Sequence, residues 1–353
     1  MTIRGQRSTI DVQSSLPNSA LRVQHSALLH TAAHLRIDRA RGPAPHKPLL
    51  LLAVADLAEQ GTQPSTKNKA PRTHSPLRAP APPREESQPR TKNNEPGTLP
   101  QILPLTPELA FRFLSFWAIV AARRPQRPDI RLPFYHMVSD GLWTPLDAAG
   151  APTTDRRHVT TVRLDPDFRA VLLDPAARAE LRRILIATYF EPGERLALYD
   201  LVGIPVPSAD AVREDAARYA ATRQSGREAR FRLTVVPAYN YTCALTGYRL
   251  TTIDAGSIVE AAHIHEFADS RNNDPRNGLA LCRNAHWSFD EGLWSLTDTC
   301  HVLVAADRFA EAGPDAYHLK RMAGAHLHLP TDPALHPDPC HLSWHRRKHG
   351  LDI

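Results

Sequence analysis

The stretch from Thr62 to Pro100 most limits how this chain can fold. It holds nine prolines and only two large aliphatic residues, Leu77 and Leu99, among Lys, Arg, Asn, Ser and Thr. Such a composition buries too little apolar surface to offset the entropy of ordering the chain. We therefore expect a flexible, disordered insertion over residues 62–100. A solvated loop is the plain interpretation, and an electrostatic contact with an anionic partner is the alternative.

The rest of the chain is long enough for two folded domains. The 353 residues are 42% hydrophobic, and a single domain of this length would be unusual. A net charge of +6 invites a nucleic-acid partner, because Lys and Arg contacts to phosphate supply most sequence-independent affinity. The stretch 62–100 has seven Lys or Arg against three Glu, a net +4, so the folded parts are close to neutral.

Cysteine usage and hydropathy indicate the compartment. The cysteines lie far apart without a CxxC pair, which is typical of reduced thiols; they are Cys243, Cys282, Cys300 and Cys340. The first residues lack an apolar core of signal-peptide length, and the longest apolar run, Leu49 to Ala55, is too short to span a membrane. We expect a cytoplasmic bacterial protein that does not act on membranes.

Hydrophobic periodicity predicts an α+β fold with a mostly helical N-terminal domain, residues 1–205, and a second domain, residues 206–353. The expected N-terminal helices cover residues 21–37, 47–60, 107–124 and 175–190, with a strand at 158–164 and loops or short strands at 124–146. A polar helical connector, broken near Gly226, is expected over 208–230. The second domain should have a strand at 257–264, a helix at 278–290, and strands at 293–296 and 301–305.

Three residues, His263, Asn277 and His286, have the spacing of a one-metal nuclease site. Hydrolysis of a phosphodiester needs a base for water, a cation that stabilises charge on the phosphate and leaving oxygen, and rigid positioning of both. Imidazole suits the base at neutral pH. A strand with the first His, a loop closed by the Asn and a helix with the second His would bring these groups together.

The surrounding pattern resembles the HNH nuclease family in its form AHI…NGLaLC…H..FD.G. The matching positions are Cys243, Thr246, Gly247, Ala262, His263, Ile264, Asn277, Gly278, Leu279, Leu281, Cys282, His286, Phe289, Asp290 and Gly292. The resemblance implies a ββα-metal fold. It also implies that His263 is the general base, that Asn277 orients the loop of that base, and that His286 holds Mg²⁺ or Mn²⁺.

One position departs from the family pattern. Many HNH enzymes have an Asp metal ligand immediately before the first His, where this chain has Ala262. Strict strand alternation disfavours Glu260 as the replacement, because it places that side chain on the face opposite to His263. Spacing does not choose among the candidates for the further ligand, which are His265, Glu260, Glu266 and Asp290.

The cysteines near the motif also differ from the family. Many HNH domains hold a structural zinc with two CxxC pairs, whereas the first pair is replaced here by Cys243 and Thr246. The sulfur count is too low for a four-cysteine site. We expect no structural zinc, with Cys243 and Cys282 as small buried groups.

Two N-terminal motifs, RARGPAPHKPLLLLAVADL at 39–57 and RLPFYHMVSDGLW at 131–143, flank the proline-rich insertion. With them, the N-terminal domain resembles the sulfur-recognising domain of bacterial restriction endonucleases that act on phosphorothioate-modified DNA. In those enzymes the domain precedes a C-terminal HNH domain, and the order agrees here. The insertion is a departure that separates the two motifs.

Sulfur in place of a non-bridging phosphate oxygen is larger, softer and a poorer hydrogen-bond acceptor. Its recognition needs a shallow apolar pocket beside basic groups that hold the remaining charge. The candidates are Pro133, Phe134 and Tyr135 for the pocket, and Arg39, His46, Lys47, Arg131 and His136 for phosphates and bases. Each also has a structural interpretation, such as Phe134 in the core or Arg39 as a surface charge.

Together these features predict a modification-dependent restriction endonuclease that binds phosphorothioate-modified double-stranded DNA and cuts nearby with one divalent metal. One alternative is an HNH endonuclease that reads methylated cytosine in an aromatic cage. Another is a non-cleaving DNA-binding protein on an HNH scaffold, as Ala262 suggests. Cutting two strands with a single-site domain suggests a homodimer or two sequential nicks. The basic segment 337–350 either contacts DNA or docks through Leu342 and Trp344.

Overall fold

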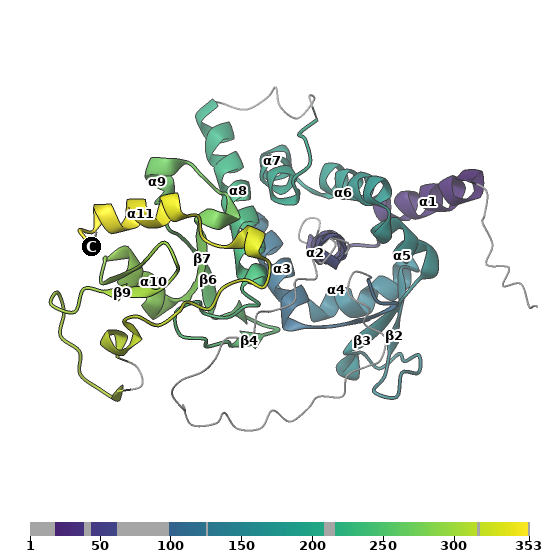
Figure 1. Ribbon diagram of the computed structural model, residues 1–353. Helices are drawn as coiled ribbons and strands as arrows, with labels where there is room; N and C mark the ends of the chain where they lie inside the picture. The colour runs from purple at the N-terminus through teal and green to yellow at the C-terminus, as the bar shows by residue number, and fades with distance from the viewer. Residues whose placement is uncertain are drawn as a thin grey trace, which may run out of the picture.

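The computed structural model describes residues 18–38, 44–61, 99–124, 126–207, 216–315 and 318–351. Arg39 and all but the last two residues of the expected insertion at 62–100 lie outside these ranges. The fold is α+β, as predicted, with many helices and four small antiparallel sheets in the described residues. Figure 1 shows α2, α4, α5 and α6 on one side, β6 to β9 with α10 and α11 on the other, and α3, α7 and α8 between them. Among the described helices, none is both long and apolar enough to cross a lipid bilayer.

The N-terminal half is built around α2 (His46–Gly61). Its residues Leu49 to Ala55 are all fully buried, because other helices cover this helix on several sides. The helices that pack on it are α3 (Pro107–Val120), α4 (Arg131–His136), α5 (Pro166–Leu173) and α6 (Pro175–Tyr189). Outside them, α1 (Asn18–Ala33) packs on α5 and α6, and α7 (Pro192–Val202) packs on α3 and α6. The predicted cap of α3 is confirmed, since Thr106 Oγ1 accepts a hydrogen bond from the backbone N–H of Leu109 at 3.2 Å.

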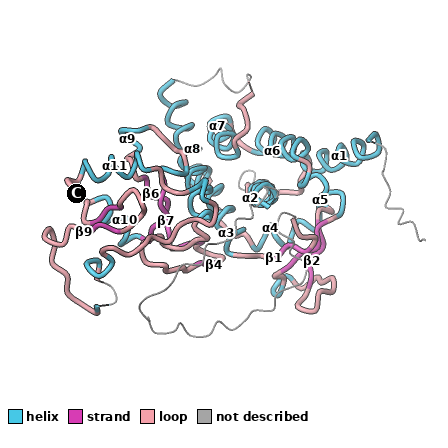
Figure 2. The backbone as a smooth tube through the Cα atoms, in the orientation of Figure 1, coloured by secondary structure: helices cyan, strands magenta, loops and turns pink. Residues whose placement is uncertain are grey.

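A three-stranded antiparallel sheet lies beside these helices (Figure 2). Its order is β1 (Ile102–Pro104), β3 (Thr161–Leu164) and β2 (Trp143–Leu146). The strand expected at 158–164 is therefore present, but it begins three residues later. The expectation of loops and strands at 124–146 is wrong for residues 131–136, which form α4. Pro133 is tolerated in the first turn of this helix, and Phe134 packs against Trp143 in the core.

From Ala216 on, the segment expected as a polar connector forms one long helix, α8 (Ala216–Ala238), which is not broken at Gly226. Residues 208–215 of that segment lie outside the described ranges. At this glycine α8 crosses α7 so closely that an added Cβ would lie 2.3 Å from the carbonyl oxygen of Ala197. The glycine therefore serves close helix packing instead of ending the helix. Because α8 also packs on α3 and β6, it belongs to the body of the fold.

A buried polar cluster joins the two halves of the molecule. Arg112 of α3 is 2% exposed, and its Nε lies 3.0 Å from the Asp56 carboxylate of α2. The same guanidinium donates to the hydroxyl of Tyr241 at 2.7 Å and to the side-chain oxygen of Gln60. Tyr241 stands two residues before Cys243, where the HNH pattern begins. One side chain thus ties α2 and α3 to the start of the C-terminal motif.

The C-terminal half is built around a β-hairpin followed by a helix. Strands β6 (Val259–His263) and β7 (Gly278–Cys282) pair antiparallel, with His263 opposite Gly278, and α10 (Arg283–Asp290) packs on them. The helix expected at 278–290 is wrong in its first five residues, because a short buried apolar run does not distinguish strand from helix. The other elements are β4 (Thr251–Thr252), β5 (Gly256–Ser257), α9 (Phe267–Ser270), β8 (Trp294–Leu296), β9 (Val302–Val304) and α11 (Pro339–Lys348).

Candidate active site and DNA-binding pocket

His263 ends β6 with its ring held between an aromatic side chain and an amide. The imidazole stacks on Phe231 of α8, with ring centroids 4.0 Å apart. Its Nε2 lies 2.9 Å from Oδ1 of Asn273. When Nε2–H donates to that oxygen, Nδ1 keeps a lone pair that can accept a proton. Burial lowers the pKa of His263 below its ordinary value of 6.5, so the ring is neutral at pH 7.

Asn277 is fully buried just before β7 and fastens the loop that follows His263. Its Oδ1 accepts a hydrogen bond from the backbone N–H of His265 at 2.7 Å. Its Nδ2 donates to the carbonyl of His265 at 2.9 Å and to that of Asn272 at 3.1 Å. One amide therefore satisfies three backbone groups of the loop, which is the position that its predicted role requires.

His286 comes from α10 and has a carboxylate beside each ring nitrogen. Its Nδ1 lies 3.4 Å from the Glu260 carboxylate, and its Nε2 lies 3.4 Å from the carboxylate of Asp290, four residues further along α10. Burial is the main cause of the lowered pKa of His263, and the nearby His286 lowers that pKa further. The hairpin and α10 thus bring all three predicted motif residues to one region.

The position of Glu260 corrects the expectation that strand alternation disfavours it. Strand β6 buries Val259 and Ala262, which are three residues apart, so its burial does not follow a two-residue period. Two-stranded ribbons twist strongly, and here the side chain of Glu260 reaches His286 of α10. Ala262 is fully buried, so the position where the family has an Asp faces the core.

The donors around His286 fit a divalent cation in their chemistry. Two carboxylates and one imidazole are ligands that Mg²⁺ and Mn²⁺ accept. As placed, Glu260 and Asp290 each lie beside a different nitrogen of His286. In the described part of the chain, no three His, Cys, Asp or Glu side chains converge as a ready-made metal-binding group. Burial raises the pKa of Asp290, while His286 beside it acts in the opposite direction.

The other two ligand candidates face α11 rather than His286. The ring of His265 stacks on Trp344 with centroids 4.0 Å apart, and Glu266 forms an ion pair with Lys348. Leu342 of the same helix is fully buried. Of the two interpretations of segment 337–350, the structure therefore supports docking on the domain.

Cys243 and Cys282 lie together beneath the hairpin. Cys243 is fully buried, and its hydrogen bonds to Cys282 and Thr246 lower the pKa of its thiol to about 5. The shared hydrogen bond has the opposite effect on Cys282, whose pKa is raised. The first of these thiols thus occupies the core position expected from the sequence, with Thr246 in the place of a second cysteine.

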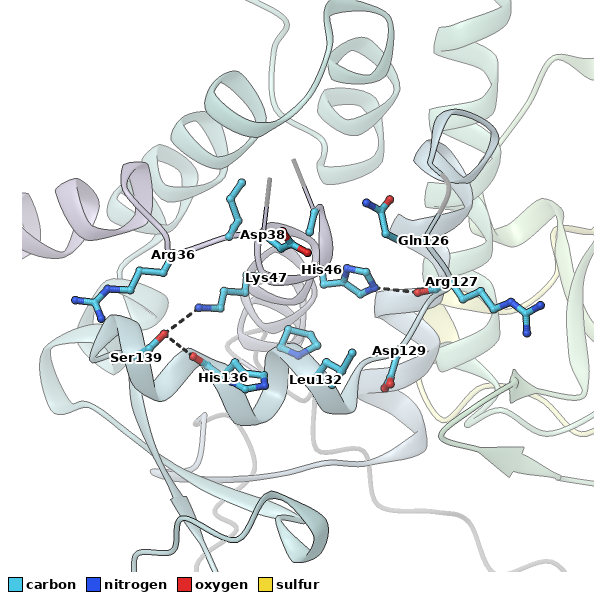
Figure 3. A pocket seen from close by; sticks show the side chains of 13 residues that line it. Arg36, Asp38, His46, Lys47, Gln126, Arg127, Asp129, Leu132, His136 and Ser139 are labelled. Atoms are coloured by element: carbon cyan, nitrogen blue, oxygen red, sulfur yellow. Dashed lines mark hydrogen bonds between the residues drawn. The ribbon is translucent and has the colours of Figure 1, made fainter. Parts of the chain in front are cut away.

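In the N-terminal half, the two motifs that flank the insertion meet at one cavity of about 620 Å³, here called the reader pocket (Figure 3). Residues of the first motif region enter from the start of α2, and residues of the second from α4 and the turn after it. Its lining consists of Arg36, Ile37, Asp38, Ala44, His46, Lys47, Gln126, Arg127, Asp129, Leu132, Pro133, His136 and Ser139. The backbone N–H of Ala44 donates to the carbonyl of Asp38 at 2.9 Å, so the segment that contains Arg39 begins and ends at the pocket.

Lys47 enters the reader pocket with its charge already paired. The lysine is 8% exposed, its ammonium lies 2.5 Å from the carboxylate of Asp140, and it donates to the hydroxyl of Ser139 at 3.1 Å. Asp140 also accepts the backbone N–H of Arg36 at 2.8 Å. Through these contacts Lys47 joins α2, the segment after α1 and the turn after α4, while its expected contact with the DNA backbone stays a prediction.

Four predicted DNA-binding residues, His46, Lys47, Pro133 and His136, line the pocket. His46 is held by a contact of its Nε2 with the carbonyl of Arg127 at 2.9 Å. Burial, and next the charge of Lys47, lower the pKa of His136, so this ring is neutral at pH 7. The pocket thus has the neutral imidazole of His136 as well as cations.

Three other predicted residues lie elsewhere. Phe134 is 1% exposed and packs in the core, and the hydroxyl of Tyr135 donates to the carbonyl of Thr154. Arg131 forms an ion pair with Asp254, in the turn between β4 and β5 of the C-terminal half. These side chains are turned away because α4 is a helix, so consecutive residues point in different directions.

Several residues of both sites have no signal in the sequence. Phe231 and Asn273 hold the ring of His263, yet the first lies 32 positions earlier on a helix that reads as polar. Asn273 stands in the polar loop that was expected, but nothing in its spacing marks it. In the reader pocket, Ile37 and Arg127 come from segments outside the two motifs.

Comparisons with known proteins agree with this geometry at the C-terminal end. The HNH endonuclease family matches residues 243–297, and no curated protein matches the chain. One solved structure, titled "Modification dependent TagI restriction endonuclease", is 22% identical with a TM-score of 0.26, over 33% of this chain and 36% of that one. This chain thus spans about a third of the length of that protein. The residues around His263, Asn277 and His286 form an HNH endonuclease domain.

Proposed function

We propose that the protein is a modification-dependent restriction endonuclease that binds phosphorothioate-modified duplex DNA in the reader pocket and cuts it with the HNH domain. One observation carries the proposal: two motifs that are more than 80 positions apart, at 44–47 and 132–139, line one cavity. This is the arrangement expected if the two motifs act on one ligand. The two motifs line this one cavity although the insertion separates them in the sequence.

The chemistry of the reader pocket suits a sulfur-bearing phosphate. Ile37, Leu132 and Pro133 supply apolar surface for a large, soft atom that accepts hydrogen bonds poorly. The cations Arg36 and Arg127 stand at opposite ends of the pocket, where they can meet the charged backbone on either side (Figure 3). Among the described residues that line it there is no Phe, Tyr or Trp, which disfavours an aromatic cage for a methylated base.

In the HNH domain, the neutral ring of His263 accepts the proton of the attacking water through Nδ1. Asn273 and Phe231 hold this ring in one orientation, and Asn277 holds the loop that follows it. Glu260, His286 and Asp290 are the residues that would hold the divalent metal. When bound, that metal supplies positive charge that stabilises the phosphate and the leaving oxygen.

The test compares three plasmids of one sequence: phosphorothioate-modified, cytosine-methylated and unmodified, each incubated with Mn²⁺ and with Mg²⁺. We expect nicking or linearisation of the phosphorothioate plasmid alone. His263→Ala should bind this plasmid without cutting it, whereas the exposed histidine variant His326→Ala should cut normally.

Other outcomes would overturn the proposal in defined ways. Equal inertness towards all three plasmids contradicts an endonuclease, and selective cutting of the methylated plasmid assigns the reader pocket to methylated DNA. Normal cutting by His263→Ala contradicts the assignment of the general base.

A further inference from the structure

Helix α10 presents one face to solvent, and this face carries more than the residues of the HNH motif. Ala285, Ser288 and Phe289 are buried against the rest of the domain. Arg283, His286, Trp287 and Asp290 follow the spacing i, i+3, i+4 and i+7, which places them together on the opposite face. Trp287 therefore lies beside His286 on the surface that a bound DNA strand must approach.

Trp287 has no structural task in the described part of the protein. Its exposure of 62% is the highest among the exposed large apolar residues there. The buried tryptophans Trp117, Trp143 and Trp294 pack in the core, and Trp344 stacks on His265. No aromatic ring or cation of the described residues packs on the indole of Trp287. An indole this exposed, with no aromatic or cationic partner among the described residues, is available to a ligand next to a nuclease residue.

Arg283 supplies the positive charge of the same face. Its guanidinium is 86% exposed and lies 3.5 Å from Glu260, and the other oxygen of that carboxylate is 3.4 Å from His286. Asp290 and Glu291 at the end of the helix are acidic, so the cation stands at the end where α10 begins. A nucleic-acid strand that crosses this face would meet a cation, the histidine and then an aromatic ring.

We propose that Arg283 and Trp287 form a DNA-contact surface of the nuclease site. The indole packs against the sugar and base edges of the nucleotides beside the scissile phosphate, and the guanidinium binds a neighbouring phosphate. Contacts to sugar and phosphate tolerate any sequence, because every nucleotide carries the same backbone. The pair thus positions DNA for cutting while the reader pocket selects which DNA is bound. This inference rests on the proposed endonuclease function.

The experiment measures steady-state cleavage of the phosphorothioate plasmid by the full chain with Mn²⁺. We expect Trp287→Ala to raise KM about 10-fold or more, as is typical when an aromatic side chain is truncated at the centre of an interface, with kcat changed about twofold or less. The KM of Trp287→Phe should lie between the KM of the wild type and that of Trp287→Ala. Arg283→Gln should raise KM. It should also make the plot of log binding constant against log salt concentration less steep, by the amount expected for about one lost phosphate contact. Ile102→Ala, which removes an exposed apolar side chain on β1, should behave as wild type.

Tryptophan fluorescence gives a second readout without cleavage. A short duplex should quench wild-type emission and protect it from acrylamide, and both effects should disappear in Trp287→Phe. Unchanged KM and unchanged quenching in the variants would overturn the inference, while a wild type that cuts no plasmid would overturn the proposed function instead. Altered self-association with normal DNA binding would also overturn it, since the face would then belong to a second copy of the chain.

Discussion

The acid sensitivity of the C-terminal domain should depend on His345 of α11. This residue is 3% exposed, its ring stacks on Phe289 with centroids 3.7 Å apart, and its nitrogens contact Ser295 Oγ at 2.9 Å and the Phe289 carbonyl at 3.1 Å. Burial, followed by the charge of His349, lowers its pKa to about 3. The folded protein therefore keeps this ring neutral at pH values where the unfolded chain protonates it.

The size of the effect follows from the two pKa values. Below pH 6.5 the unfolded state binds a proton that the folded state does not, so stability falls as the pH falls, down to about pH 3. Each pH unit in this window costs about 1.4 kcal/mol. Between pH 7 and pH 5 the loss from this histidine is about 2 kcal/mol.

Urea unfolding, followed by tryptophan emission to which Trp294 beside Phe289 contributes, measures this effect. We expect His345→Gln to be less stable than wild type at pH 7 by about 1–3 kcal/mol, because its hydrogen bonds and ring stacking are lost. The difference should shrink by about 2 kcal/mol at pH 5, because glutamine does not titrate. An equal dependence on pH in both proteins would refute the reasoning.

Three further predictions concern the active site and the junction. Asn277→Ala should lower kcat by about 100-fold or more with plasmid binding retained, because three backbone groups of the loop lose their partner; unchanged cleavage would contradict that role. Cleavage measured against pH should keep its plateau down to pH 6.5 and fall below it, since burial lowers the pKa of His263; EDTA should abolish it and excess Mn²⁺ restore it. Gly226→Ala should destabilise the protein by about 1–3 kcal/mol in urea, because its Cβ meets the backbone of Ala197; a stabilised variant would show that the helices can separate.

The sequence predicted the parts of the fold that depend on local patterns. Thr106 with Pro107 begins α3, Asp174 with Pro175 begins α6, and the alternation before Leu164 forms β3. Local patterns failed where a tertiary contact decides. Gly226 looks like a helix end until α7 is seen to cross α8 at that point.

The candidate sites divide in the same way. His263, Asn277 and His286 were predictable, because a hairpin and the next helix bring consecutive segments together. The partners of these residues were not, since Phe231 comes from a distant helix, and strict strand alternation does not predict that Glu260 lies 3.4 Å from His286. In the reader pocket, residues 131–136 form a helix where loops or short strands were expected. The helix places Pro133 and His136 in the lining and turns Arg131, Phe134 and Tyr135 away from it.

The buried contacts of Arg112 limit how this protein can be recombined with others. Its buried guanidinium binds Asp56 and Tyr241, which belong to opposite halves of the chain. A foreign nuclease half would leave the Arg112–Asp56 ion pair intact but remove the Tyr241 hydroxyl, so the buried guanidinium would lose a hydrogen-bond acceptor, which costs about 1–3 kcal/mol. The two halves are therefore not interchangeable cassettes: exchange in evolution or by design has to carry α2, α3 and α8 together.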